Sequence, residues 1–212
     1  MTRRPSLLAV ALLSWLVCFA VLAELGTWTP FAFVGVLLVV LALRSSALPL
    51  LQFRPSRDSL LIGAGAGVLM VLLTHLSYGW LSAVFPGVRA STSQLLSLLN
   101  VVGFSPRDRA GLIVVIASCE EVLFRGLLPG SARGLPRPMR APDAREFGAI
   151  ALWSAIYALT TMPLRSPLLV LCAFVCGTLW GTLRVATQSV IVPILAHVLW
   201  DLGVLLVWPL PS

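Results

Sequence analysis

Several apolar runs in this 212-residue chain are long enough to cross a lipid bilayer, and they restrict its possible folds more than any other feature. A spanning helix needs about 20 residues at a rise of about 1.5 Å each. Hydrophobic residues make up 58% of the chain and charged residues only 11%, far below the roughly one quarter usual in soluble domains. The sequence therefore predicts an all-α protein, a polytopic bundle of transmembrane helices.

Charged residues and Pro or Gly breaks divide the apolar sequence into about seven candidate spans. They are residues 7–25, 30–43, 60–85, 111–128, 147–164, 168–183 and 189–208. The second span is short, and only Arg44 separates it from apolar residues that reach Phe53, so it is either tilted or continued by a re-entrant piece. The first run is a span or, alternatively, a signal peptide, because Arg3 and Arg4 precede its apolar core.

The basic residues are spread between the spans instead of forming one block. All 15 are arginines, against 8 acidic residues, for a net charge of +7. Nucleic-acid binding needs a contiguous basic face, so this pattern argues against it. With the N-terminus inside, ten Arg residues fall in inner segments and four in outer ones. The sequence thus predicts an integral, multi-pass protein in contact with membrane lipid, in a bacterial plasma membrane, with a cytoplasmic N-terminus.

Two connections between spans have a composition of their own. Residues 88–104 place Leu95, Leu96, Leu99 and other apolar side chains among Ser, Thr, Gln and Asn. This spacing predicts an amphipathic helix in the membrane interface, where it can shelter an entrance from the bilayer. Residues 129–146 are rich in Pro and Arg, which is typical of an exposed connector and predicts a cytoplasmic loop.

Five ionisable residues fall inside two of the predicted spans, at a cost of several kcal/mol each unless they are paired. The fourth span holds Glu120, Glu121 and Arg125, and the last holds His197 and Asp201. Glu121 and Arg125 are four residues apart, in the order that favours a side-chain ion pair. Glu120 is turned by about 100° from its neighbour, so one carboxylate can be neutralised while the other is available for chemistry.

His197 and Asp201 are one helical turn apart and share a face of the last span. If this face opposes the acidic face of the fourth span, two carboxylates and an imidazole surround one small wet cavity. A glutamate in such a cavity can take a proton from water. The sequence therefore predicts a polar, water-containing site within the membrane that can take part in proton transfer.

The motifs around these residues resemble those of a known family. Residues 119–128, CEEVLFRGLL, are similar to the EExxxR motif and its FRG extension in the CPBP family of CAAX-processing and bacteriocin-processing membrane proteases, also called Abi proteins. Residues 193–201, PILAHVLWD, resemble the last motif of that family, HxxxN or HxxxD. The resemblance divides the chain into variable N-terminal transmembrane helices with the interfacial helix, 1–110, and a CAAX protease-like core, 111–208.

The resemblance implies an intramembrane endopeptidase that acts on a peptide or a membrane protein. Carried over, Glu120 is the base that activates water, and His197 and Asp201 stabilise the oxyanion. Glu121 and Arg125 then support the site. The chemistry of the family has been framed both as glutamate-driven and as dependent on a divalent metal such as Zn.

The middle motif departs from the family pattern. The family carries FxxxH in a span between the other two motifs, and here the run from Tyr157 has Thr161 where that histidine belongs. A threonine cannot replace an imidazole as a base or as a metal ligand and can only position a water. The only other histidine, His75, lies at a similar depth by a count of about 1.5 Å per residue, so its entry into the site from the third span is a hypothesis.

Other readings of the same residues remain open. A non-catalytic homologue, acting as a scaffold or an immunity-type partner, accounts for the missing histidine. A proton-coupled transporter also uses membrane-embedded acids, although the chain has no visible inverted repeat. Cys172 and Cys176 are one turn apart, but Gly177 and Gly181 beside them favour close helix packing over a metal site.

Overall fold

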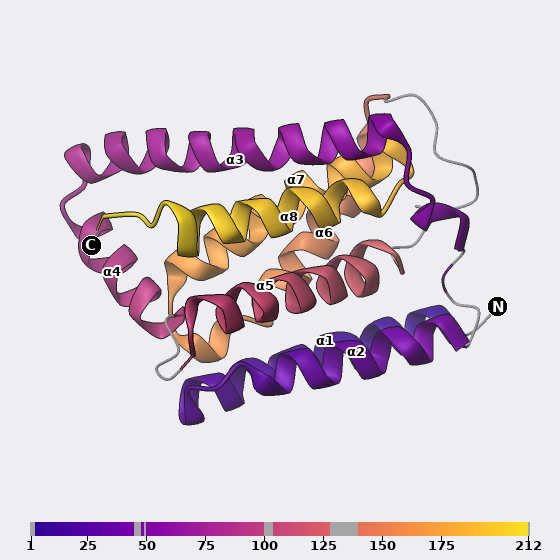
Figure 1. The fold of residues 1–212 in the computed structure, drawn as a ribbon, viewed down its shortest axis with the longest axis horizontal. Coiled ribbons are helices and arrows are strands. Elements are labelled where there is room, and N and C mark those ends of the chain that lie inside the picture. Colours follow the sequence, from indigo (N-terminus) through magenta and orange to yellow (C-terminus); the bar gives the residue numbers. More distant parts are fainter. Residues whose placement is uncertain (1–2, 45–47, 49, 100–103, 128–139, 212) are drawn as a thin grey trace.

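The computed structural model describes residues 3–44, 48, 50–99, 104–127 and 140–211, which form helices with no strand among them (Figure 1). The α-helices are α1 Arg3–Leu25, α2 Thr29–Arg44, α3 Arg57–Val84, α4 Gly87–Leu99, α5 Pro106–Glu120, α6 Ala144–Leu159, α7 Pro167–Thr187 and α8 Ile191–Leu202. Two 3-10 segments, η1 Leu50–Phe53 and η3 Met162–Leu164, and two π-helical segments, η2 Glu121–Arg125 and η4 Gly203–Val207, complete them. The predicted all-α membrane bundle is confirmed.

The seven predicted spans each coincide with a helix, but the helices differ in their capacity to cross a membrane. Within the described part of the chain, three are long and apolar enough: Ser6–Leu25, Arg57–Val84 and Pro167–Thr187. Two shorter apolar helices occupy Thr29–Arg44 and Ile191–Val207. The remaining two, α5 and α6, have 15 and 16 residues and are each extended by a short segment of different helical geometry.

The first two helices are packed parts of the bundle. α1 buries Trp15 and Phe19, and both rings contact Phe31 of α2 edge-on. α2 is continuous up to Arg44, and the apolar sequence that follows forms only the short η1 segment among the described residues. Residues 45–47 and 49 lie outside the described residues. Of the segment that the sequence offers as a re-entrant piece, the structure therefore describes mainly η1.

Helix starts in the second half of the chain follow from local capping. The Ser105 and Asp108 side chains each bond to the backbone N–H of the other at the start of α5. Asp143 and Glu146 form the same reciprocal capping box at the start of α6. These boxes satisfy N–H groups that a helix leaves unpaired at its start, and they fix where the helices that carry the acidic motif and Tyr157 begin.

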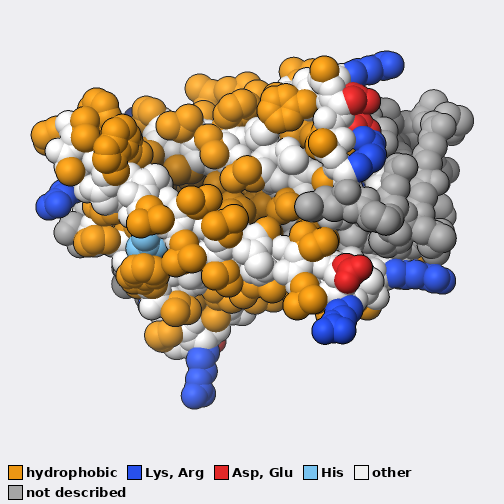
Figure 2. Space-filling model, turned by 90° about the horizontal axis from the view of Figure 1, so that it is seen from above, with side chains coloured by type: hydrophobic (Ala, Val, Ile, Leu, Met, Phe, Trp, Pro, Cys, Tyr) orange, Lys and Arg blue, Asp and Glu red, His pale blue; other side chains and the backbone are white. Residues whose placement is uncertain are grey.

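The long faces of the bundle are apolar on the outside. In Figure 2, hydrophobic side chains cover the length of the face shown, while Arg, Asp and Glu side chains project mainly from its edges and ends. Leu61 of α3 and Phe33 of α2 are exposed over 62% and 72% of their area. Exposed aliphatic and aromatic side chains on this scale are expected where lipid is the solvent.

Helices α3 and α8 pack closely through glycine. A Cβ atom at Gly67 would lie 2.8 Å from the Cβ of Leu199 and 3.0 Å from the backbone oxygen of Ala196. Gly63 has the same relation to Leu195 and Val192 one turn earlier. Small residues let two membrane helices approach this closely, and the approach holds the helix that carries His197 against α3.

We expect Gly67→Ala to lower the free energy of unfolding by about 1–3 kcal/mol, because the added methyl group meets the α8 backbone, which cannot rotate away. The measurement is the unfolding of the purified protein in detergent. Gly65→Ala is the matched control, since nothing lies within 4 Å of a Cβ at this exposed position of the same helix. Equal stabilities of the two variants would contradict the prediction.

The predicted interfacial segment 88–104 is a helix over its described part. α4 covers Gly87–Leu99 and lies across one end of the bundle, away from the N-terminus (Figure 1). Residues 100–103 of that segment lie outside the described residues. So does most of the predicted connector 129–146, of which residues 140–146 lead into α6 and contain an ion pair between Arg140 and Glu146.

Candidate active site

The acidic motif lies where α5 changes from α-helical to π-helical geometry. Glu120 ends α5, and Glu121–Arg125 form η2, closed by a bond from the Gly126 N–H to the Glu121 carbonyl oxygen at 3.0 Å. Single π-helical turns within α-helices are frequent at functional sites. A Cβ atom at position 126 would overlap the Val122 carbonyl oxygen, which explains the glycine after the arginine.

Glu121 and Arg125 form a buried ion pair within this turn. The Glu121 Oε1 atom lies 3.0 Å from Arg125 Nη1, and Glu121 and Arg125 are only 0% and 4% exposed. The guanidinium also lies over the rings of Tyr157 and Trp180, 5.0 and 5.3 Å from their centroids. The arginine thus neutralises the second carboxylate of the motif, in the arrangement that the sequence spacing predicts.

Glu120 is held by side chains from two other helices, α1 and α6. Its Oε1 accepts a hydrogen bond from Nε1 of Trp15 at 2.6 Å, and its Oε2 accepts one from the Tyr157 hydroxyl at 2.7 Å. The same Oε2 lies 3.9 Å from Nε2 of His197. The first glutamate of the motif and the histidine of the last span therefore meet, as expected of opposed faces.

His197 lies between three carboxylates. Its Nδ1 is 2.9 Å from Glu121 Oε1, and its Nε2 is 3.4 Å from Asp201 Oδ2 and 3.9 Å from Glu120 Oε2. Ionised carboxylates only accept hydrogen bonds, so a ring that carries a proton on each nitrogen can donate to acceptors on both sides. Trp180 stacks on the ring at a centroid distance of 3.6 Å, which fixes its plane.

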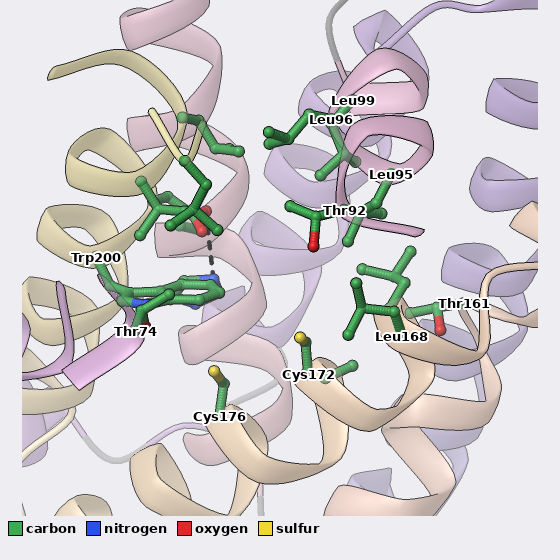
Figure 3. Close-up of a pocket in the computed structure, with 18 of the residues that line it drawn as sticks. Thr74, Thr92, Leu95, Leu96, Leu99, Thr161, Leu168, Cys172, Cys176 and Trp200 are labelled. Atoms are coloured by element: carbon green, nitrogen blue, oxygen red, sulfur yellow. Dashed lines mark hydrogen bonds and ion pairs between the residues drawn. The ribbon is translucent and has the colours of Figure 1, made fainter. Parts of the chain in front are cut away.

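A cavity of about 260 Å³ opens beside this cluster. Glu120, Thr161, His197 and Asp201 are among the residues that line it. Figure 3 shows its walls, with residues of α4 on one side and residues of α7 on another: Thr92, Leu95, Leu96, Leu99, Leu168, Cys172 and Cys176. The candidate site is thus a small polar group of side chains at the wall of a mainly apolar chamber.

A second cavity of about 360 Å³ adjoins the first. Leu96 and Leu99 of α4, and Asp201 of α8, line both. The second cavity continues past Ile113 of α5 to Arg109 near the start of that helix. The two cavities together therefore connect the acidic cluster with the end of the bundle where α5 begins.

Thr161 lies at the cavity wall without reaching the carboxylates. It is 1% exposed, and its hydroxyl donates to the backbone oxygen of Ala158 at 2.8 Å. A hydroxyl bonded back to its own chain is ordinary in membrane helices. The Tyr157 hydroxyl, one turn earlier, is the group from this motif that contacts Glu120.

The structure does not bring His75 to the cluster. Its ring stacks on Trp208 at a centroid distance of 3.8 Å, and its nitrogens lie 2.9 and 2.8 Å from the carbonyl oxygens of Val71 and Trp208. Residues next to it on α3, Thr74 and Ser77, line the cavity instead. A residue count along the predicted spans gives His75 and Glu120 similar depths, but the structure places their side chains among different neighbours.

The side chains of the cluster do not fit a metal ion. Among the described residues, no group of three or more His, Cys, Asp or Glu side chains is placed to hold one. Both nitrogens of His197 are already next to carboxylates. Next to Cys176, a Cβ atom at Gly177 would lie 3.0 Å from Arg125 Nη2, so close packing explains the small residues there.

Three neighbours of the cluster are not predicted from the sequence. Trp15, Tyr157 and Trp180 each lie against Glu120 or His197. Trp15 had a signal of its own, because it stands in the middle of an apolar span, whereas tryptophans in membrane proteins are enriched at span ends. A buried indole usually has a partner for its N–H, and here this partner is Glu120.

Comparison with protein families gives one result for the segment that carries the cluster. Residues 107–203 match the family described as type II CAAX prenyl endopeptidase Rce1-like. This segment is similar to that family over slightly less than half of the chain. The resemblance to the CPBP proteases is thereby confirmed, and the match includes Glu120, His197 and Asp201. Comparisons with curated proteins and with solved structures found no match.

Proposed function

We propose that this protein is an intramembrane endopeptidase that hydrolyses a peptide bond near the bilayer with a water activated by Glu120. The observation that carries the proposal is the meeting of Glu120 and His197, with Nε2 and Oε2 3.9 Å apart, at the wall of one cavity. The Rce1-like family is a family of proteases. The family is described as a type II CAAX prenyl endopeptidase, which supports a prenylated CAAX peptide as the substrate to test.

In the proposed reaction, Glu120 accepts a proton from water as the oxygen attacks the carbonyl carbon of the scissile bond. His197 stabilises the developing oxyanion, because a cationic N–H in an apolar chamber interacts strongly with negative charge. Asp201 orients the imidazolium from one side and Glu121 from the other. Glu120 then returns its proton to the leaving amine.

The remaining residues act as supports in this scheme. Arg125 neutralises Glu121 and keeps the π-helical turn in place. We propose residues 111–208 as the protease-like core and residues 1–110 as the variable part that covers it. The protein is an integral membrane protein; the arginine distribution supports a bacterial plasma membrane with the N-terminus in the cytoplasm.

A specific observation favours a second candidate, a non-catalytic homologue that binds a membrane partner. The position of the second motif histidine is occupied by Thr161, whose hydroxyl is bonded to its own chain. No titratable group from that motif position faces the water that Glu120 would activate. A scaffold or immunity-type protein needs the cavity but not the base.

A cleavage assay separates the two candidates. The full-length protein in lipid nanodiscs is incubated with a farnesylated peptide that ends in a CAAX box and with an unlipidated transmembrane peptide. We expect turnover by the wild type, none by Glu120→Ala, and normal turnover by Glu24→Ala, whose carboxylate is exposed near the end of α1. Absence of turnover in all three proteins, or equal turnover with and without Glu120, contradicts the peptidase.

A further inference from the structure

We propose that Trp15 of α1 is a positioning residue for Glu120, whose carboxylate it holds from the side opposite Tyr157. Trp15 lies outside the matched segment 107–203. The proposal therefore adds a residue from the N-terminal half of the chain to the site. Its effect on turnover rests on the proposed function, whereas the contact itself does not.

The contact is short and enclosed. Trp15 is 0% exposed, Glu120 is 6% exposed, and the distance from Nε1 to Oε1 is 2.6 Å. A hydrogen bond is stronger where water is excluded, because the local dielectric is low and water does not compete for the acceptor. Trp15 is thus bound to the carboxylate and not merely adjacent to it.

The indole ring has little freedom to move. Phe31 and Phe124 contact it edge-on, with centroid distances of 5.8 and 5.5 Å. A Cβ atom at Gly35 of α2 would lie 3.1 Å from the far edge of the ring and 2.9 Å from Cys119. Because Gly35 has no side chain, the indole ring has room to reach Glu120, the residue after Cys119.

The second donor makes the arrangement specific. Tyr157 of α6 donates to the other oxygen of the same carboxylate at 2.7 Å. Two donors from different helices fix the plane of the carboxylate, and each oxygen keeps one lone pair that can accept a proton from water. A phenylalanine at position 15 would fill most of the same space without burying an N–H group that needs a partner. Packing alone therefore does not require the indole N–H, which bonds to Glu120.

Positioning by Trp15 gives the first helix a role at the site. With Tyr157 alone, the carboxylate turns about its last side-chain bond and the attacking water loses a fixed direction. A misplacement of about 1 Å at a reacting group costs up to a hundredfold in rate. The Rce1-like segment alone therefore holds Glu120 from one side only, and α1 supplies the other.

The contact is tested without any substrate. The protein is labelled with ¹⁵N-tryptophan in detergent micelles, and the Trp15 indole resonance is assigned by its loss in Trp15→Phe. We expect this resonance to move strongly in Glu120→Ala, while that of Trp153, a partly buried tryptophan of α6, stays in place. An unmoved Trp15 resonance overturns the proposal, whether or not the protein is a peptidase.

The role in turnover is tested by kinetics on the farnesylated CAAX peptide. We expect Trp15→Phe to lower kcat about tenfold or more with KM little changed, because the indole touches the base and not the substrate. Trp153→Phe makes the same chemical change away from Glu120 and is expected to keep its kcat. A purely structural Trp15 would reduce stability and yield but leave the kcat of the folded protein unchanged.

The outcomes distinguish this proposal from the proposed function. If the wild type has no turnover but the Trp15 resonance responds to Glu120→Ala, the proposed peptidase activity is contradicted and the hydrogen bond from Trp15 to Glu120 is supported. If the wild type turns over and Trp15→Phe keeps its full kcat, the peptidase stands and the positioning role fails. If Trp15→Phe does not fold, the resonance in Glu120→Ala is compared with all tryptophan resonances of the wild type, and a response in none of them overturns the contact.

Discussion

Arg125→Met is expected to lower the free energy of unfolding by about 3–5 kcal/mol. The variant leaves the fully buried Glu121 carboxylate without its guanidinium partner, 3.0 Å away in the wild type. Removal of one member of a buried ion pair is strongly destabilising, and Glu121 then keeps Nδ1 of His197, 2.9 Å from its Oε1, in place of two partners. The measurement is chemical unfolding of the purified protein in mixed micelles.

Two further variants separate charge from side-chain volume. Arg140→Met breaks the ion pair with Glu146 at the start of α6, where both side chains are partly exposed, and is expected to change stability little. Adding Glu121→Gln to Arg125→Met removes the carboxylate charge that has lost its guanidinium partner. The double variant is therefore expected to regain part of the lost stability. If Arg125→Met is as stable as the wild type, the pair does not hold the motif together.

His197→Phe is expected to lower kcat by about 10²–10³, the usual cost of one lost donor to a tetrahedral oxyanion. Phenylalanine keeps a flat ring over Trp180 but removes both nitrogens, so the three carboxylates around the ring lose their common partner. KM is expected to change less than kcat, since the oxyanion exists only after attack. The measurement is initial rates on the farnesylated CAAX peptide.

His75→Phe provides the matched control, because His75 also stacks on a tryptophan, Trp208. The structure places His75 outside the cluster, so we expect this variant to keep the wild-type kcat. A large loss in His75→Phe would restore His75 as a member of the site. Equal kcat values for His197→Phe and the wild type would remove His197 from the proposed mechanism.

The helix positions could be predicted from the sequence because lipid imposes a simple pattern on it. The spans are long apolar runs, and the charged residues and capping boxes mark their ends. The pairing of Glu121 with Arg125 was also predictable, because both belong to one helix and helical geometry fixes which side chains meet. Local rules thus account for most of the fold.

Contacts between helices that are distant in the sequence were harder to predict from it. Counting residues places His75 and Glu120 at similar depths, but depth does not say toward which neighbour a helix face is turned. The position of Trp15 in mid-span suggests a buried polar partner, but only the packing of α1 against α2 and η2 reveals that this partner is Glu120. The relative rotation of helices is set by packing such as that at Gly67 and Gly35.

The apolar lining of the two adjoining cavities has a consequence for selectivity. Leu96 and Leu99 line both, so a peptide that reaches Glu120 must leave its hydration shell along a hydrocarbon wall. Each amide stripped of water without a new partner costs about 1–3 kcal/mol. In the proposed peptidase, hydrophilic loops are therefore excluded by the cost of their desolvation, while a segment flanked by apolar groups recovers that cost on entry.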